Sequence, residues 1–384
     1  MKILLIKMSP VDGLNSSTLR TLALAKGLNK LDYEVYYLTV PVSNCHVINE
    51  SNNVIDSINI IRTPPNEIYD SLTSKSKKRS PFKSIIIKLL RAVYHKLSIY
   101  DYTYKIAKDI NIDILDEKTY DIIISSSDPK TSHIVAKRLI SQGIKYNRWI
   151  QYWGDPLAYD ITNKAIYSKW ILKKFELNLI KKADKIVYVS PFTYELQIRE
   201  FPGIADKMTW LPIPYIEKKE YDETSNDIFT IGYFGAYKSS VRNIYPLYEA
   251  CKKMNNIHLD IVGDSDITLE ETDNIKNYPR GNVDDLEKNA DLLVCILNSS
   301  GTQIPGKIYH YAATNKPILV ILDGEKKEKM REYLKRFGRY VMCDNDEKSI
   351  LDAINEIKNM DKKYEPCPYF EPQNIAIRLV KTIN

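Results

Sequence analysis

The stretch GTQIPGKIYHYAATNKPILVIL (residues 301–322) joins a helical segment to an apolar strand and shows the pattern of the whole chain. Pro305 and Gly306 stand where a helix begins, and Lys307 falls in its first turn. That turn is the positive end of the helix macrodipole, so a cation there is mildly unfavourable unless an anion faces it. Exposed N–H groups at a helix start also form a natural phosphate site. Two interpretations of Lys307 stay open: a partner for phosphate, or a solvated surface lysine.

The same alternation of β-rich runs and helical patterns continues in both directions and is interrupted once. β-rich runs lie at residues 2–8, 34–40, 58–63, 120–127, 148–154 and 185–190, and again at 229–235, 258–263, 291–297, 316–322 and 339–343. Helical patterns between them include 131–141, 163–182, 244–254 and 305–313. The interruption, WLPIPYIEKKEYDETSND (210–227), has two prolines and a run of charges, which are typical of a linker.

This alternation predicts an α/β protein with two Rossmann-like, doubly wound domains, each a mostly parallel sheet covered on both faces. The expected parts are an N-terminal domain at 1–212, a linker at 213–228, a C-terminal domain at 229–365, and a C-terminal helix within 366–384 that packs back on the N-terminal domain. Ligands of such folds bind at the carboxyl ends of the strands, so we expect the site in the cleft between the domains.

Composition excludes several classes of protein. The chain has 384 residues, 44% hydrophobic and 27% charged, as globular proteins do. Its five cysteines form no CxxC pair and its five histidines no HExxH pattern, so we expect a reducing compartment, no metal and no cofactor. Only four consecutive apolar residues follow Lys2, too few for a signal peptide, and no run approaches the roughly 18 of a membrane span. These features predict a cytoplasmic protein.

The positive charge is concentrated in one segment. Residues 71–100 carry eight lysine or arginine side chains and no acid, and without them the net charge of +6 would be −2. Within 75–97 the apolar residues follow helical spacing, which favours either a basic amphipathic helix at an anionic membrane surface or an ordinary helix with its stripe in the core. Nucleic-acid binding is not expected, because no aromatic side chains are interleaved with these charges.

Several stretches together carry a resemblance to a known family. They are ADKIVYVS (183–190), WLPIP (210–214), IGYFGAY (231–237), LDIVGD (259–264), RGNVDDLEKNADLLVCIL (280–297) and QIPGKIYHYAATNKPILVI (303–321) and, more loosely, SSSDPKTSHIVAKRL (125–139) and YWGDP (152–156). In order and spacing the chain resembles the retaining GT-B glycosyltransferases of family 4, also called glycosyl transferases group 1. The resemblance implies a GT-B fold and metal-independent transfer of a hexose from a nucleoside-diphosphate sugar, UDP-linked or similar. It also implies a glycan or polyprenyl-linked acceptor, retention of configuration and a place in surface polysaccharide synthesis.

The resemblance implies roles for residues of the C-terminal half. The backbone N–H groups of Gln303, Ile304 and Gly306 would hold the donor diphosphate, and Lys307 would pair with its phosphate oxygens.

Other family positions complete the implied donor site. Gly235 would let the backbone approach the ligand, and Val283 would contact the edge of the nucleobase. Arg242 and Lys238 would neutralise charge on the leaving group, although both also suit a solvated loop.

The chain departs from the family at His310. The family usually has a glutamate there that grips the ribose hydroxyls, and its earlier acidic position is Thr302 here. A neutral imidazole can donate one hydrogen bond and accept another, but it lacks the two acceptor oxygens of a carboxylate. The substitution leaves open whether the donor is held differently, whether catalysis is weakened, or whether this histidine meets no ligand.

Three residues of the N-terminal half are candidates for the acceptor side. Asp155 follows a strand, so it is expected in a loop at the carboxyl end of the sheet, although an Asx turn would explain it equally well. His133 suits the acceptor side or an ordinary helix surface. Gly13 follows the first strand and resembles a reduced form of the family's glycine pair.

Three other functions were weighed on the same residues. The substitution at His310 would suit a non-catalytic subunit that binds a nucleotide sugar. A sugar-nucleotide epimerase would need the same donor and no acceptor. A dinucleotide-dependent oxidoreductase fits least, because neither KMSPVDGLNSS nor GYFGAYKSS has the G-x-G-x-x-G spacing.

Overall fold

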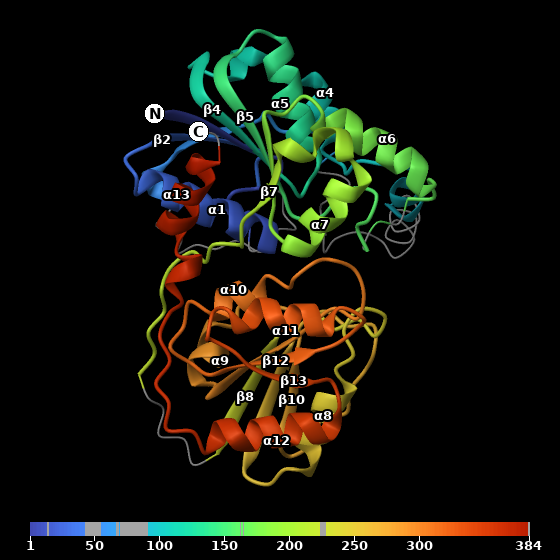
Figure 1. The fold of residues 1–384 in the computed structure, drawn as a ribbon, viewed down its shortest axis with the longest axis vertical. Coiled ribbons are helices and arrows are strands. Elements are labelled where there is room, and N and C mark those ends of the chain that lie inside the picture. The colour runs from blue at the N-terminus through green and yellow to red at the C-terminus, as the bar shows by residue number, and fades with distance from the viewer. Residues whose placement is uncertain are drawn as a thin grey trace. The chain divides into compact units, whose positions relative to one another are not determined.

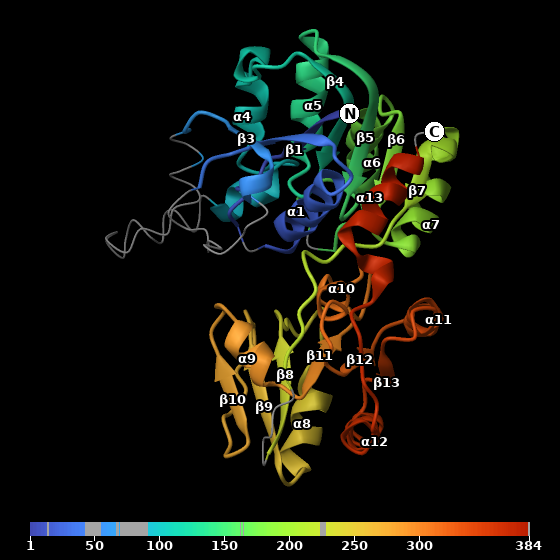
Figure 2. The ribbon, with the colours of Figure 1, turned by 90° about the vertical axis from the view of Figure 1, so that its left-hand side faces the viewer.

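The computed structural model describes residues 1–382 except 14, 43–54, 67–68, 70–90, 162, 164 and 223–227. The chain divides into two compact units. Unit 1 comprises Met1–Ile216 with Pro372–Asn384, and unit 2 comprises Glu217–Glu371. Each contains a parallel sheet with helices packed against it (Figure 1, Figure 2).

Unit 1 is built on a seven-stranded sheet in the order β3-β2-β1-β4-β5-β6-β7, and its paired strands are parallel. The strands are β1 (Lys2–Lys7), β2 (Glu34–Thr39), β3 (Asn59–Arg62), β4 (Thr119–Ser126), β5 (Lys145–Trp153), β6 (Lys185–Tyr188) and β7 (Met208–Trp210). Between β1 and β4 the order of the strands reverses, which is where ligands of doubly wound folds bind.

One helix of unit 1, α13 (Pro372–Lys381), comes from the C-terminal end of the chain, after all of unit 2. Other helices of this unit are α1 (Ser16–Asn29), α4 (Tyr104–Asp109), α5 (Thr131–Ser141), α6 (Lys169–Ile180) and α7 (Pro191–Glu200). Figure 1 and Figure 2 both show α13, in red, beside α1, in blue. The two approach so closely that a Cβ atom on Gly27 would lie 2.1 Å from the carbonyl oxygen of Pro372.

Unit 2 is built on a six-stranded parallel sheet in the order β10-β9-β8-β11-β12-β13. The strands are β8 (Phe229–Phe234), β9 (Ile257–Val262), β10 (Ile275–Tyr278), β11 (Leu292–Ile296), β12 (Ile318–Leu322) and β13 (Val341–Asp344). The helices are α8 (Tyr245–Lys253), α9 (Asp284–Asn289), α10 (Lys307–Tyr311), α11 (Lys327–Lys335) and α12 (Glu347–Lys358). The order of the strands reverses between β8 and β11, and the segments that follow these two strands carry the donor-site candidates.

Two local expectations differ from the structure. The helix expected at 305–313 is only the five-residue α10, capped by Gly306. So short a helix carries a small dipole, and the surroundings of Lys307 must be explained by its neighbours instead. The segment expected as a linker at 213–228 is shared between the units, because Lys219 already donates its backbone N–H to Ala313 in unit 2. None of the described helices is long and apolar enough to cross a membrane.

Candidate functional site

In unit 2 the segments that follow β8 and β11 are held together by an arginine. The Nε atom of Arg242 donates to the side-chain oxygen of Asn298 at 2.9 Å, and its guanidinium also donates to the carbonyl of Ala236 at 2.9 Å. Asn298 in turn donates to the carbonyl of Gln303 at 3.4 Å. Among the described residues no carboxylate forms a salt bridge with Arg242. The structure thus brings Arg242 and Gln303 together and leaves the arginine charge without an acid.

Lys307 opens α10 and has an unusual environment. Its ammonium lies 5.2 Å from the centroid of the Tyr311 ring, and no described residue accepts a hydrogen bond from it or pairs with it. Burial lowers the pKa of Lys307, and the nearby Glu287 partly offsets that effect. Lys307 is part-exposed, and its ammonium has no acceptor among the described residues, so an anion at this position would gain a charge-assisted hydrogen bond.

Two further polar atoms near Lys307 are buried without a hydrogen-bond partner among the described residues. They are Nε2 of Gln303 and Nε2 of His310. Burial, followed by the charges of Lys307 and Lys219, lowers the pKa of His310 to about 3. His310 is therefore neutral at pH 7, and its ring can donate one hydrogen bond and accept another. These two unsatisfied atoms and the ammonium of Lys307 thus belong to a stretch of eight residues.

The charges of Arg242 and Lys307 both act on one side chain of the sheet. Burial raises the pKa of the Cys295 thiol, on β11, to about 11, and both cations act in the opposite direction. Since charge interactions of this kind fade with distance, both side chains lie near the carboxyl half of β11. The two cations proposed from the family resemblance therefore share one region of unit 2.

A second group at this region was not predicted from the sequence. Glu287, on α9, is buried and accepts hydrogen bonds from Lys219 Nζ at 3.2 Å and from Tyr221 Oη at 2.9 Å. Lys219 also pairs with Asp284 at 3.2 Å. Val283 directly precedes α9 and accepts the backbone N–H of Glu287. The start of α9 and the start of α10 are thus electrostatic neighbours.

The remaining donor-side candidates have simple surroundings. Lys238 is exposed, and its carbonyl accepts the backbone N–H groups of Val241 and Arg242, which shapes the turn that carries the arginine. A Cβ atom on Gly235 would meet only the Tyr233 hydroxyl, at 3.9 Å, within 4 Å. Ile304 is buried and Gly306 caps α10.

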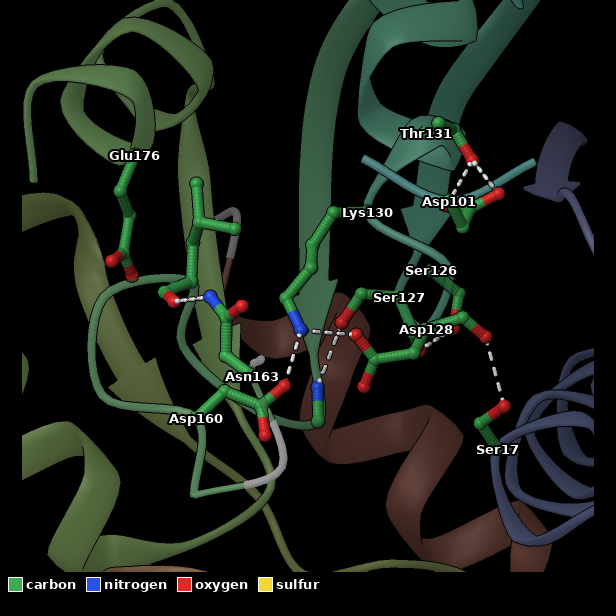
Figure 3. Close-up of polar contacts among 12 residues, drawn as sticks. Ser17, Asp101, Ser126, Ser127, Asp128, Lys130, Thr131, Asp160, Asn163 and Glu176 are labelled. Carbon is green, nitrogen blue, oxygen red and sulfur yellow. Dashed lines mark hydrogen bonds and ion pairs between the residues drawn. The ribbon is translucent and has the colours of Figure 1, made fainter. Parts of the chain in front are cut away.

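In unit 1 a network of charged side chains lies at the carboxyl ends of β1, β4 and β5. Lys130 is its centre: its ammonium lies 2.6 Å from Asp128 and 2.9 Å from Asp160. Figure 3 draws both contacts as dashed lines. The buried Lys7 ammonium and the Ser17 hydroxyl both donate to the carbonyl of Asp128. Cations and acids alternate here, so the network neutralises itself.

Asp155 lies beside this network and differs from its other acids. It is part-exposed, and no described residue donates a hydrogen bond to its carboxyl group. Burial, together with the charges of Asp128 and Asp160, raises the pKa of Asp155 to about 7. A carboxyl that titrates near neutrality can exchange a proton with a bound hydroxyl.

The other acceptor-side candidates are interior residues. His133 is fully buried, hydrogen-bonds Ser125 at 2.8 Å and stacks on Trp153 with a centroid distance of 4.3 Å. A place on the helix surface, one of the two expectations for His133, is therefore wrong. Gly13 is buried in a turn, where its backbone N–H donates to the carbonyl of Pro10 at 3.1 Å.

Another buried acid was not predicted. Glu176, on α6, accepts the backbone N–H of Ala158 at 2.9 Å, and burial raises its pKa to about 7. It supports the loop that follows Asp155. Among the residues that the structure describes, no group of three or more histidine, cysteine, aspartate or glutamate side chains could hold a metal ion.

Solved structures resemble the chain over its whole length. HepE from Anabaena, solved with UDP and glucose, matches with a TM-score of 0.58 at 11% identity, covering 100% of this chain and 97% of that one. The chain has the GT-B fold. MnaA from S. aureus, solved with UDP, matches with a TM-score of 0.52 at 13% identity and 95% of its length. A glycosyltransferase from Rickettsia africae matches with a TM-score of 0.51 at 15% identity and 93% of its length. Both of these also cover all of this chain.

At these identities the likeness shows the fold and not the activity. No known family model and no curated protein matches the sequence. The two parallel-sheet domains expected from the alternating elements, and the GT-B fold that the resemblance implied, are confirmed, whereas the roles of individual residues stay predictions.

The basic segment is described only in part. Residues 70–90 lie outside the described residues, and 91–97 are helical. Within it, Val93 and Leu97 are 46% and 55% exposed, so these two members of the apolar stripe do not enter a core. Tyr94 is half-buried and donates its hydroxyl to the carbonyl of Asp101.

Proposed function

We propose that the chain is a glycosyltransferase that moves a sugar from a nucleoside-diphosphate sugar to a glycan or lipid-linked glycan. The observation that carries this proposal is the pair of cations Arg242 and Lys307 at the carboxyl edge of a GT-B unit, neither of which forms a salt bridge with an acid among the described residues. The UDP named for the Anabaena and S. aureus structures supports a uridine diphosphate donor.

The proposed donor site uses the unsatisfied groups of unit 2. The diphosphate binds between Lys307 and the backbone at Gln303–Gly306, and Arg242 approaches the same phosphates. As the bond from sugar to phosphate breaks, negative charge grows on the leaving group, and cations held in place stabilise that charge most in the transition state. The neutral His310 binds a ribose hydroxyl through its unpaired Nε2 atom, and Val283 contacts the base.

The proposed acceptor side is unit 1. Asp155 hydrogen-bonds the acceptor hydroxyl, since its carboxyl has no partner among the described residues and titrates near pH 7. We further propose retention of configuration without a metal, with the departing phosphate taking the acceptor's proton, in surface polysaccharide synthesis. These finer points rest on the family resemblance.

Calorimetry with UDP, GDP, ADP and CMP tests the donor site. We expect one nucleoside diphosphate to bind, and Lys307→Ala to weaken it by about 1.5–3 kcal/mol, the range for a hydrogen bond to a charged group. Lys335→Ala is the matched control, because that lysine is exposed on α11 of the same unit. Absence of binding, or equal affinity of wild type and Lys307→Ala, would refute the donor site.

Product analysis separates the two alternatives. A protein that binds the donor but transfers no sugar to any acceptor would be the non-catalytic subunit that the substitution at His310 suits. Conversion of the donor sugar in the absence of an acceptor would instead indicate an epimerase.

A further inference from the structure

Exposed apolar side chains gather on one part of unit 1. Leu97 and Val93, in the helix at 91–97, are 55% and 46% exposed, and Ile166 and Trp170 are 67% and 63% exposed. Trp170 lies on the exposed side of α6, near its start. Leu172, Glu176 and Leu179 lie on the opposite side of the helix and are buried. We call the four side chains Val93, Leu97, Ile166 and Trp170 the apolar face. Large apolar groups exposed together mark an interaction surface.

Hydrogen bonds join the two segments that carry the apolar face. The backbone N–H of Ile166 donates to the carbonyl of Lys96 at 3.0 Å, and the Tyr167 hydroxyl donates to the carbonyl of Leu97 at 2.7 Å. Because these bonds hold the two segments side by side at the start of α6, we treat the apolar groups as one surface rather than two separate sites.

Positive charge surrounds the apolar face. Residues 91–100 and 169–182 contain seven lysine or arginine residues and one acid, Glu176, which is buried on the inward side of α6. One of the seven, Lys173, pairs with Glu200 on α7. Lys96, Lys169 and Lys174 are exposed, and the ammonium of Lys174 lies 3.6 Å from the centroid of the Trp170 ring. An exposed tryptophan with lysines around it is the composition that lies at the boundary between lipid head groups and acyl chains.

We propose that the apolar face and its lysines dock unit 1 on an anionic lipid bilayer. The indole and the aliphatic side chains enter the boundary of the acyl chains, and the three ammonium groups meet the head groups. A second copy of the chain fits less well, because two such faces would bring positive charge against positive charge. The proposal goes beyond the glycosyltransferase activity and does not depend on it.

The chain carries its own reporter for this docking. It has four tryptophans, of which Trp149 and Trp153 are fully buried, Trp210 is half-buried and Trp170 is exposed. Insertion of Trp170 into lipid should shift its emission to shorter wavelength and protect it from iodide. Trp170→Phe should keep most of the binding and lose most of that shift.

Co-sedimentation with vesicles of phosphatidylcholine, with and without one-third phosphatidylglycerol, tests the proposal on the full chain. We expect binding to the anionic vesicles that falls with salt, and weak binding to the neutral ones. The double variant Ile166→Ser/Trp170→Ser should weaken binding by about tenfold or more, as should Lys169→Glu/Lys174→Glu. Ile228→Ser and Lys335→Glu are controls, because both residues are exposed in unit 2.

Three results would overturn the proposal. One is absence of binding to anionic vesicles. Another is full-strength binding by the two double variants, which would assign the docking to a different part of the chain. The third is a lipid-free dimer that Ile166→Ser/Trp170→Ser dissociates, which would make the face a contact between copies. Unchanged urea unfolding, followed by the fluorescence of the tryptophans that remain in unit 1, shows that this unit is intact in every variant. Because none of these measurements uses a nucleotide, the test stays separate from that of the donor site.

Discussion

Replacing Asp155 by asparagine should stabilise unit 1, and the gain should grow with pH. The pKa of Asp155 is about 7 in the folded chain against a reference value of 3.8. Below pH 3.8 the carboxyl is neutral in both states. Between 3.8 and 7 only the unfolded chain loses the proton, so the wild type loses stability as pH rises, and above 7 the loss is complete. Asparagine keeps the shape of the neutral acid and has no proton to lose.

The magnitude follows from the two pKa values. Each pH unit between them is worth about 1.4 kcal/mol, so from pH 5 to pH 7 the difference between variant and wild type should grow by up to about 2.7 kcal/mol. Because Asp155 is part-exposed, we expect about 2 kcal/mol, with no further growth from pH 7 to pH 8.

Urea unfolding followed by tryptophan fluorescence measures this difference in the right part of the chain. All four tryptophans lie in unit 1, so the signal reports that unit alone. Asp128→Asn is the contrasting variant: Lys130 holds the pKa of Asp128 below its usual value, so its loss should destabilise unit 1 near pH 7 and matter less in acid. A gain for Asp155→Asn that is equal at pH 5 and pH 8, or a loss at pH 8, would refute this account of the network.

Three other changes have expected outcomes. Arg242→Gln should lower the rate of sugar transfer, measured as release of nucleotide at saturating donor, by about 100-fold. Donor affinity, measured by calorimetry, should change less than tenfold. Gly27→Ala should destabilise the chain in urea, although alanine favours helices, because its Cβ would lie 2.1 Å from the Pro372 carbonyl; Gly203→Ala, where nothing lies within 4 Å, is the control. His310→Ala should weaken nucleotide binding in calorimetry, because it removes the Nε2 atom proposed to bind a ribose hydroxyl; unchanged affinity would contradict that.

The long apolar runs explain why the architecture could be predicted. β4 and β8 lie within one residue of the runs at 120–127 and 229–235, because each is a continuous buried strand flanked by polar turns. β7 and β10 were missed, since they have only three and four residues and MTW and IKNY form no apolar run. Such short strands form because a neighbouring strand offers backbone hydrogen bonds to them. That pairing cannot be seen in the local sequence.

Residues of the candidate site could be predicted from the sequence only where they lie together in one segment. Lys307 and His310 are three residues apart on α10, so their shared surroundings follow from helical spacing. Glu287 pairs with Lys219 and Tyr221, which lie 68 and 66 residues earlier in a segment that looked like a linker. Side chains that are far apart in the sequence and meet only in the folded chain have no characteristic spacing by which a sequence motif could identify them.

The substitution at His310 and the isolation of Lys307 have one physical explanation. A glutamate at position 310 would lie one turn from Lys307 and could pair with it, because both side chains would share a face of α10. The histidine is neutral, with a pKa of about 3, so it leaves the positive charge of Lys307 uncancelled. Glu287 does not cancel it either, because Lys219 and Tyr221 already occupy that carboxylate. Unit 2 thus keeps a part-buried cation available, and an anionic ligand is the partner that would stabilise it most.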